Sequence, residues 1–174
     1  MKWGDIPRLT ECNNLGASYD LDGFIQHIEK EEAMWGLVLI PDFQRGHVWT
    51  EEQQVAFVEF WLMGGKSGNI VYFNAPNYPN TYADGSYVCV DGLQRITALR
   101  RFYYNEIKAF GHYYKEFEGR LSIMKCSMEI RVNNLKTREQ VLQWYLEMNT
   151  GGTPHSKEEI DRVKELLRQS KEES

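Results

Sequence analysis

Apolar residues spaced three and four apart predict helices in several parts of the chain. Residues 21–32 place Leu21, Phe24, Ile25 and Ile28 on one helical face. After the pair Asp91-Gly92, apolar residues return at the same spacing at Leu93, Ile96, Leu99 and Tyr103. This spacing predicts that a helix begins immediately after the Asp-Gly turn.

Three capping boxes predict where further helices begin. In a capping box the first side chain accepts a bond from the backbone N–H three residues on, and the later side chain bonds back. Thr50 with Gln53 opens a predicted helix over 50–63, which would bury Val55, Val58, Trp61 and Leu62. Two more boxes, Thr137 with Gln140 and Ser156 with Glu159, predict helices of about a dozen residues each.

Alternating and continuous apolar runs predict the strands. In residues 124–132, Met124, Cys126, Met128, Ile130 and Val132 alternate strictly with polar residues. Short apolar runs at 36–40, 70–73 and 87–90 predict buried strands, and the Asn-, Pro- and Gly-rich residues 74–86 predict a loop. Because strands and helices mix irregularly, the pattern favours an α+β fold, a small mixed sheet flanked by helices, over a doubly wound sheet.

Length and charge limit the classes of function. With 174 residues the chain is long enough for one core, and we expect a single domain over 1–168 with a solvated tail at 169–174. The net charge of −5 argues against a protein that binds DNA over its whole surface. Any contact with DNA is therefore expected through a local basic cleft.

The cysteines and the apolar runs indicate the cellular compartment in which we expect the protein. Cys12, Cys89 and Cys126 are odd in number and contain no CxxC pair, which indicates a reducing compartment and gives no zinc framework. No apolar run approaches the roughly 18 residues of a membrane helix, and the first residues lack the apolar core of a signal peptide. We expect a cytoplasmic protein that does not contact a membrane.

The turn at Asp91-Gly92 is the most informative segment for chemistry. A helix that begins at a glycine turn after a buried strand presents unpaired N–H groups and the positive end of its dipole, so an anion is its natural ligand. Asp91 occupies the expected N-cap, and Gln94 and Arg95 lie in the first turn, within reach of a phosphate. The alternative is an N-capping aspartate followed by two surface polar residues.

Two further segments are candidates for the same chemistry. In residues 41–49 we expect Phe43, Val48 and Trp49 to anchor the loop while Gln44, Arg45 and His47 project. Arg45 is either a second phosphate ligand or the partner in a salt bridge. Residues 149–156 join a Gly-Gly pair to hydroxyl side chains, and they either wrap an anion with backbone amides or connect two helices.

Three motifs in this order carry a resemblance: residues 40–45 followed by Val48-Trp49, residues 90–99, and residues 149–154. Together they resemble the N-terminal domain of GmrSD-type restriction enzymes (the DUF262 type), a branch of the ParB/sulfiredoxin-like superfamily. The resemblance implies a small α+β fold that binds a nucleoside triphosphate, with ATP as the first candidate and Mg²⁺ as its metal.

The resemblance also implies roles for individual residues. Asp91 would be a general base or the Mg²⁺ ligand, and Arg95 would act beside it as a catalytic residue. The residues implied to bind the nucleotide or its phosphates are Gln44, Arg45, Gly92, Gln94, Thr97, Asn149, Gly151, Gly152 and Thr153. His47 and His155 are candidate accessory groups, His155 because an aliphatic residue is usual there. Leu93 also departs from the pattern, which commonly has a polar residue.

The implied activity is NTP hydrolysis or phosphoryl transfer, with a hydroxyl on DNA or on a modified base as a plausible acceptor. Two alternatives stay open: a nuclease or nuclease subunit that acts on modified DNA, and a nucleotide-gated module that binds DNA or protein without turnover. Because the chain ends soon after the third motif, we expect no separate HNH-type nuclease domain here. Expected partners are the nucleotide, DNA, and either another protein or a second copy of the chain.

Overall fold

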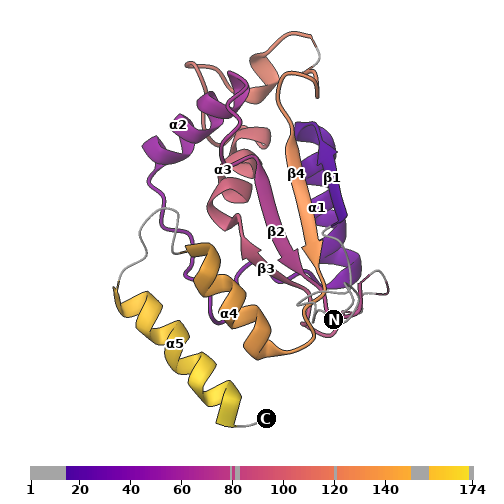
Figure 1. Cartoon of the computed structure of the whole chain (residues 1–174). Helices are drawn as coiled ribbons and strands as arrows, with labels where there is room; N and C mark the ends of the chain where they lie inside the picture. The colour runs from indigo at the N-terminus through magenta and orange to yellow at the C-terminus, as the bar shows by residue number, and fades with distance from the viewer. Residues whose placement is uncertain (1–14, 79, 81–82, 120, 150–156, 173–174) are drawn as a thin grey trace, which may run out of the picture.

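The computed structural model describes residues 15–78, 80, 83–119, 121–149 and 157–172 (Figure 1). Four strands and five α-helices are assigned in this part of the chain. In order they are β1 (Leu15–Tyr19), α1 (Leu21–Trp35), α2 (Glu51–Leu62), β2 (Ile70–Asn74), β3 (Val88–Asp91), α3 (Leu93–Tyr103), β4 (Met128–Asn133), α4 (Arg138–Asn149) and α5 (Lys157–Glu172). A short 3₁₀ turn, Tyr114–Glu116, lies between α3 and β4.

The four strands form one mixed sheet in the order β1-β4-β2-β3. Strand β4 is antiparallel to β1 and parallel to β2, and β3 is antiparallel to β2. The β2–β3 register shifts between Tyr72 and Phe73, and Tyr72 lies opposite Asp91 at the end of β3. This architecture confirms the expected α+β fold with a small mixed sheet and flanking helices.

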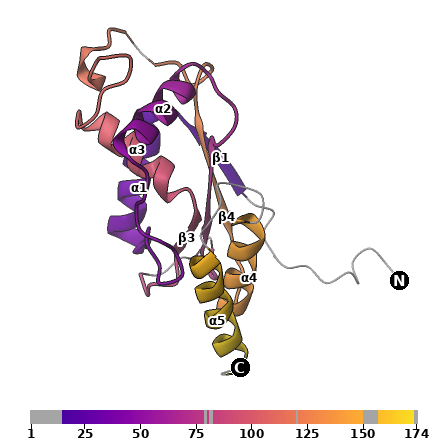
Figure 2. The same cartoon turned by 90° about the vertical axis from the view of Figure 1, so that its left-hand side faces the viewer.

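Helices cover both faces of the sheet, and each face has its own core. Helices α1, α2 and α3 lie on one face, while α4 and α5 pack together on the other, toward the β3 side (Figure 2). Adjacent residues of β3 point to opposite faces: Cys89 joins the larger core, which includes Phe24, Trp61 and Leu99, and Val90 joins the smaller one. The Asp91-Gly92 turn therefore follows directly from a strand that is held on both faces.

Within the described residues, the positions predicted for the beginnings of the helices are confirmed. Thr50 and Gln53 form a complete capping box at α2, and Thr137 and Gln140 bond reciprocally at α4. Helix α1 begins at an N-cap that the spacing did not single out, where Asp20 Oδ1 accepts from Gly23 N at 2.9 Å. The Ser156–Glu159 box lies partly outside the described residues.

Two predicted strands are wrong in extent. Residues 36–40 make only a single bridge, between Val38 and Val88, because Gly36 adopts φ +65° as the C-cap of α1 and Ile40 is exposed. Strand β4 begins at Met128 instead of residue 124, because the backbone N–H groups of Lys125 and Cys126 both bond back to Ser122 O in a turn. The alternating pattern continues through that turn, which is why periodicity could not find its end.

The C-terminal end differs from a simple tail. Helix α5 continues through Glu172, so residues 169–172 are its last, mostly exposed turn. Cys89 and Cys126 are buried free thiols, and Cys12 lies outside the described residues. None of the helices in the described ranges is long and apolar enough to cross a bilayer.

Candidate functional site

The turn between β3 and α3 is built around one glycine. Gly92 is the N-cap of α3, with φ +126° and no side-chain cap, so the expected N-cap role of Asp91 is wrong. Asp91 is instead the last residue of β3. A Cβ on Gly92 would lie 2.5 Å from Val71 Cγ1, so β2 lies too close for any side chain. The first turn of α3 thus begins against the sheet, and its N-cap residue has no side chain that could accept from the N–H groups of that turn.

Arg95 joins this turn to the beginning of β2 through an ion pair with Asp91 and two hydrogen bonds to backbone carbonyls. Arg95 Nη2 lies 2.6 Å from Asp91 Oδ2, and Arg95 Nη1 donates to the carbonyl oxygens of Gly68 and Ile70 at 3.1 and 2.8 Å. The Arg95 side chain is only 15% exposed, while Asp91 is 37% exposed. Arg95 is therefore committed to the protein, and Asp91 is oriented by it while staying open to solvent.

Gln94 joins the two motifs that the sequence separates. Its Oε1 accepts from Val48 N and Trp49 N at 3.0 and 3.2 Å, and its Nε2 donates to Gly46 O at 3.1 Å. One amide side chain on α3 therefore satisfies three backbone groups of the 46–49 loop. This geometry holds the loop beside the first turn of α3 and leaves at most one Nε2 hydrogen of Gln94 for a phosphate.

We expect Gln94→Ala to lower the free energy of unfolding by about 1–2 kcal/mol, because three backbone groups of the loop, one of them partly buried, lose their partner at once. Urea unfolding followed by tryptophan fluorescence measures the change. Gln143→Ala is the matched control, since Gln143 Nε2 donates only to Glu147 within an exposed face of α4, and we expect a change within about 0.5 kcal/mol. Equal effects of the two variants would contradict the role given to Gln94.

The loop that carries Arg45 is anchored differently from the expectation. Phe43 is buried against Tyr145, with ring centroids 5.2 Å apart, but Val48 is 50% exposed and anchors nothing. Gln44 does not project: its Oε1 is buried and has no hydrogen-bond partner. Trp49 is half-buried and packs on Phe57. The loop therefore points Gln44 inward, beside Cys89 in the middle of β3.

Helices α4 and α5 hold the same loop from the other side. Arg45 Nη1 lies 3.3 Å from Glu159 Oε2, so the salt-bridge alternative for Arg45 describes this structure. Arg162 Nη2 donates to Asp42 O at 2.6 Å, and Arg138 Nη2 bonds to Asp42 Oδ2 at 2.6 Å. Sequence reasoning missed these partners because they lie about a hundred residues from the loop and belong to no local pattern.

Tyr145 marks where the charged groups gather. Burial raises the pKa of Tyr145 to about 12, with Arg45 opposing that rise and Glu159 and Asp91 adding to it. A single phenol in the α4 core thus senses both Asp91 and Arg45. Arg45 and Asp91, which the sequence places in different motifs, thus both influence the pKa of this phenol.

The remaining candidates are placed less centrally. Thr97 Oγ1 donates to Leu93 O at 2.8 Å within its own helix, and Leu93 is itself buried in the core. His47 is mostly exposed. Its pKa lies below the usual value, mainly because the part of the imidazole that is buried loses hydration of its charged form, and also because Arg101 is nearby. Asn149 is the last residue of α4. Gly151, Gly152, Thr153 and His155 lie outside the described residues.

The donor set suits magnesium held mainly by a nucleotide. Among the described residues no three His, Cys, Asp or Glu side chains cluster as a metal site. Asp91 uses Oδ2 for Arg95, which leaves Oδ1 for a cation. Mg²⁺ usually takes one or two carboxylates together with phosphate oxygens and water, so a single carboxylate fits a metal that arrives with a triphosphate.

A comparison with protein families decides the relationship. The model of the N-terminal domain of the GmrSD restriction endonuclease matches residues 21–127, which is more than half of the chain. The chain belongs to the GmrSD N-terminal domain family. Membership indicates a nucleotide-binding module of a restriction system. No curated protein and no solved structure matches the chain.

The GmrSD match divides the site in two. It includes the loop with Gln44 and Arg45 and the turn with Asp91 and Arg95. Helices α4 and α5, which supply Tyr145, Glu159 and Arg162, lie beyond the matched residues. The features shared with the GmrSD family are therefore enclosed, in this chain, by two helices that the match does not cover.

Proposed function

We propose that this domain binds a nucleoside triphosphate at the first turn of α3 and hydrolyses it or transfers its terminal phosphoryl group to a hydroxyl. The observation that carries the proposal is the uncapped start of α3 at Gly92, beside an Asp91 carboxylate that Arg95 orients. An uncapped helix start attracts anions through its N–H groups and dipole. Phosphoryl transfer needs mainly charge neutralisation and an oriented nucleophile.

Each residue has a distinct proposed part. Backbone N–H groups of the first turn receive the phosphates, and Arg45 exchanges Glu159 for a phosphate oxygen when the nucleotide binds. Asp91 accepts the proton of the attacking hydroxyl or water, or holds Mg²⁺ through Oδ1. Arg95 is a positioning residue, because its guanidinium is already bonded to Asp91 and to two carbonyls at and just before the start of β2.

Magnesium would supply neutralisation of the charge that develops on the phosphates. The protein's own contribution is to fix the Asp91 carboxylate and to keep the Arg45 loop beside α3 through Gln94. ATP is the first candidate nucleotide, and a hydroxyl on DNA or on a modified base is the proposed acceptor. DNA would approach through a basic surface local to this site.

One incubation tests the proposal and its alternatives. The protein receives γ-labelled ATP, GTP or CTP with Mg²⁺, alone or with ordinary or hydroxymethylated DNA. We expect label on DNA for transfer or free labelled phosphate for hydrolysis, and Arg45→Ala should weaken nucleotide binding about tenfold. Arg168→Ala is the control, because Arg168 pairs only with residues of its own exposed α5 turn.

The other outcomes choose among the alternatives. Shortened DNA would favour the nuclease, which the GmrSD restriction endonuclease name of the family keeps as the second candidate. Binding without turnover would favour the gated module. Failure of every nucleotide to bind would overturn the proposed function.

A further inference from the structure

Exposed apolar side chains gather where α2 ends, at the end of the molecule away from α4 and α5 (Figure 1). Met63, the C-cap of α2, is 70% exposed, and Met124, in the turn before β4, is 86% exposed. The two turns meet, because a Cβ on Gly64 would lie 3.3 Å from Lys125 O. Two of the most exposed apolar side chains of the chain therefore belong to one surface.

Phe110 joins this surface from the segment after α3. Its backbone N–H donates to Glu59 Oε1 at 2.7 Å, which holds it against the helical turn that precedes Met63. Phe110 has φ +51°, a conformation that bulky residues rarely adopt, and its ring is about half exposed. The protein thus holds an apolar ring in solvent on a strained backbone. The exposed apolar side chains of this end, named here the α2-end patch, are Phe60, Met63, Phe110, Ile123 and Met124.

Two exposed lysines flank the α2-end patch. Burial raises the pKa of the Cys126 thiol, and both Lys66 and Lys125 oppose that rise, so both ammonium groups lie near this thiol. Within the described ranges, neither Lys66 nor Lys125 pairs with a carboxylate. Glu59, the acidic residue beside Phe110, already accepts from the backbone. The margin of the patch is therefore positively charged, although the whole chain has a net charge of −5.

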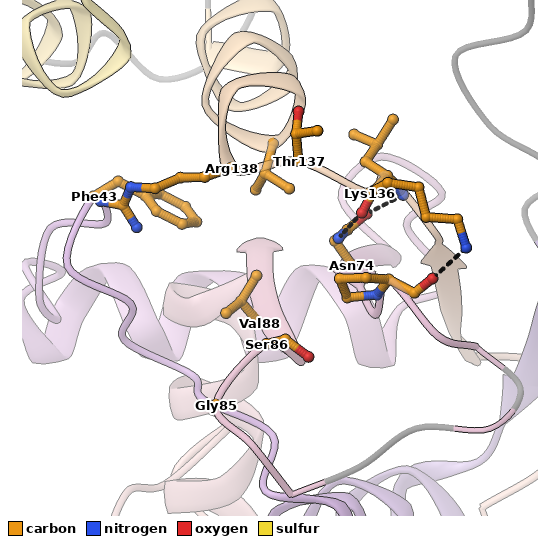
Figure 3. Close-up of a pocket in the computed structure, with 11 residues that line it drawn as sticks. Phe43, Asn74, Gly85, Ser86, Val88, Lys136, Thr137 and Arg138 are labelled. Atoms are coloured by element: carbon orange, nitrogen blue, oxygen red, sulfur yellow. Dashed lines mark hydrogen bonds between the residues drawn. The ribbon is translucent and has the colours of Figure 1, made fainter. Parts of the chain in front are cut away.

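The cationic side chains of the cavity between α4 and β3 are different, because they are already bonded (Figure 3). This cavity has a volume of about 220 Å³. Lys136 Nζ donates to Pro76 O at 2.5 Å, and Arg138 Nη2 bonds to Asp42 Oδ2 at 2.6 Å. A charged ligand of the cavity would have to break these bonds. The lysines of the α2-end patch can meet an anionic partner without any such loss.

The composition of the patch indicates the chemistry of its partner. An apolar centre with a cationic margin is complementary to an apolar stripe with acidic margins. Nucleic acid fits less well, because it is bound by many cations and by stacked rings, and Met63, Ile123 and Met124 have no ring. A second copy also fits less well, because a symmetric contact between two patches would bring the lysines of both copies together.

We propose that the α2-end patch binds an amphipathic helix of a partner protein whose apolar stripe is flanked by Asp and Glu. Methionine side chains adapt to the irregular surface of such a helix. The inference goes beyond the proposed function, because the patch lies at the far end of α2 from the Trp49–Gln94 contact. Helix α2 has 12 residues and is therefore about 18 Å long, so the partner leaves Asp91 open.

Fluorescence anisotropy with two designed helical peptides tests the proposal. Both carry leucine on one face, and the other face carries glutamate in one peptide and lysine in the second. We expect the glutamate peptide to bind about tenfold more tightly than the lysine peptide. The double variant Lys66→Glu/Lys125→Glu should reverse this preference, and Met63→Ser/Met124→Ser should weaken the glutamate peptide about tenfold.

Met34→Ser/Ile40→Ser is the matched control, since both side chains are exposed apolar groups away from the α2-end patch. We expect it to change neither affinity. Amide NMR of the wild-type chain adds a readout that needs no variant: the glutamate peptide should shift the signals of Gly64 and Met124. Shifts confined to other surfaces, or equal binding of the two peptides, would overturn the proposal.

The other occupants give distinct results. A dimer in sedimentation velocity that Met63→Ser/Met124→Ser dissociates would identify a second copy and overturn the proposal. A DNA oligonucleotide that binds through Lys66 and Lys125 while neither peptide binds would do the same. Nucleotide affinity should be unchanged in all these variants. If no nucleotide binds but the glutamate peptide does, the proposed function fails and the partner surface stands.

Discussion

Gly92→Ala is expected to lower the free energy of unfolding by about 3 kcal/mol or more, because two costs coincide at this position. Alanine is strained at φ +126°, and its Cβ would lie 2.5 Å from Val71 Cγ1 and 3.3 Å from Val71 Cα. Val71 is fully buried in the larger core, so it cannot move aside without disturbing the sheet. Urea unfolding gives the magnitude.

Gly111→Ala separates the two costs. Gly111 also has a positive φ, +79°, but nothing lies within 4 Å of the position its Cβ would take. We expect this control to cost only about 1 kcal/mol, the conformational part. The difference between the two variants then measures the close approach of α3 to β2. Similar losses at both glycines would show that the packing against Val71 contributes little.

The Gly92 contact explains why the fold was easier to predict than the site. Helical spacing, alternation and capping depend on neighbours a few residues apart, so α1, α2, α3 and β2 were found close to their true positions. The N-cap at Gly92 depends on Val71 in another strand, and no local pattern contains that contact. Asp91 therefore looked like the cap when only its neighbours in sequence were considered.

The same reasoning applies to the charged groups. Motif positions identified Arg45, Gln94 and Arg95, but not what each one bonds to. Glu159 lies 114 residues from Arg45, and its helix lies beyond the family match. A polar residue in a motif can bind a ligand or hold the protein together, and only tertiary contacts distinguish the two. Here they indicate that Gln94 and Arg95 mainly hold the site in shape.

The two arginines of the site differ in how easily a phosphate can displace their carboxylate partners. Arg95 and Arg45 each face a carboxylate, so the site carries paired charges before a nucleotide arrives. The Arg45–Glu159 pair is the easier to open, because it is longer, 3.3 Å against 2.6 Å, and because only Arg95 is also bonded to two carbonyls. An incoming phosphate would therefore displace Glu159 and leave the Asp91–Arg95 pair in place.

Asp91→Asn should reduce phosphoryl transfer or hydrolysis at least 100-fold while nucleotide affinity changes less than about threefold. The substitution removes the base, or the carboxylate for Mg²⁺, and general-base and electrostatic contributions of this kind are worth about 10²–10³ in rate. Asparagine keeps an oxygen that can accept from Arg95 Nη2, so the turn should stay in place. Initial rates and calorimetric titration measure the two quantities separately.

Asp161→Asn is the matched control, since Asp161 is an exposed carboxylate on α5 and contributes to none of the proposed steps. Arg95→Lys adds a second comparison: lysine keeps the charge but cannot bond to Asp91 and to both carbonyls in one plane. We expect Arg95→Lys to lower the free energy of unfolding by about 1–3 kcal/mol and to lower the rate of phosphoryl transfer or hydrolysis as well. Full activity of Asp91→Asn would remove Asp91 from the chemistry, and the first turn of α3 would remain only as a binding site.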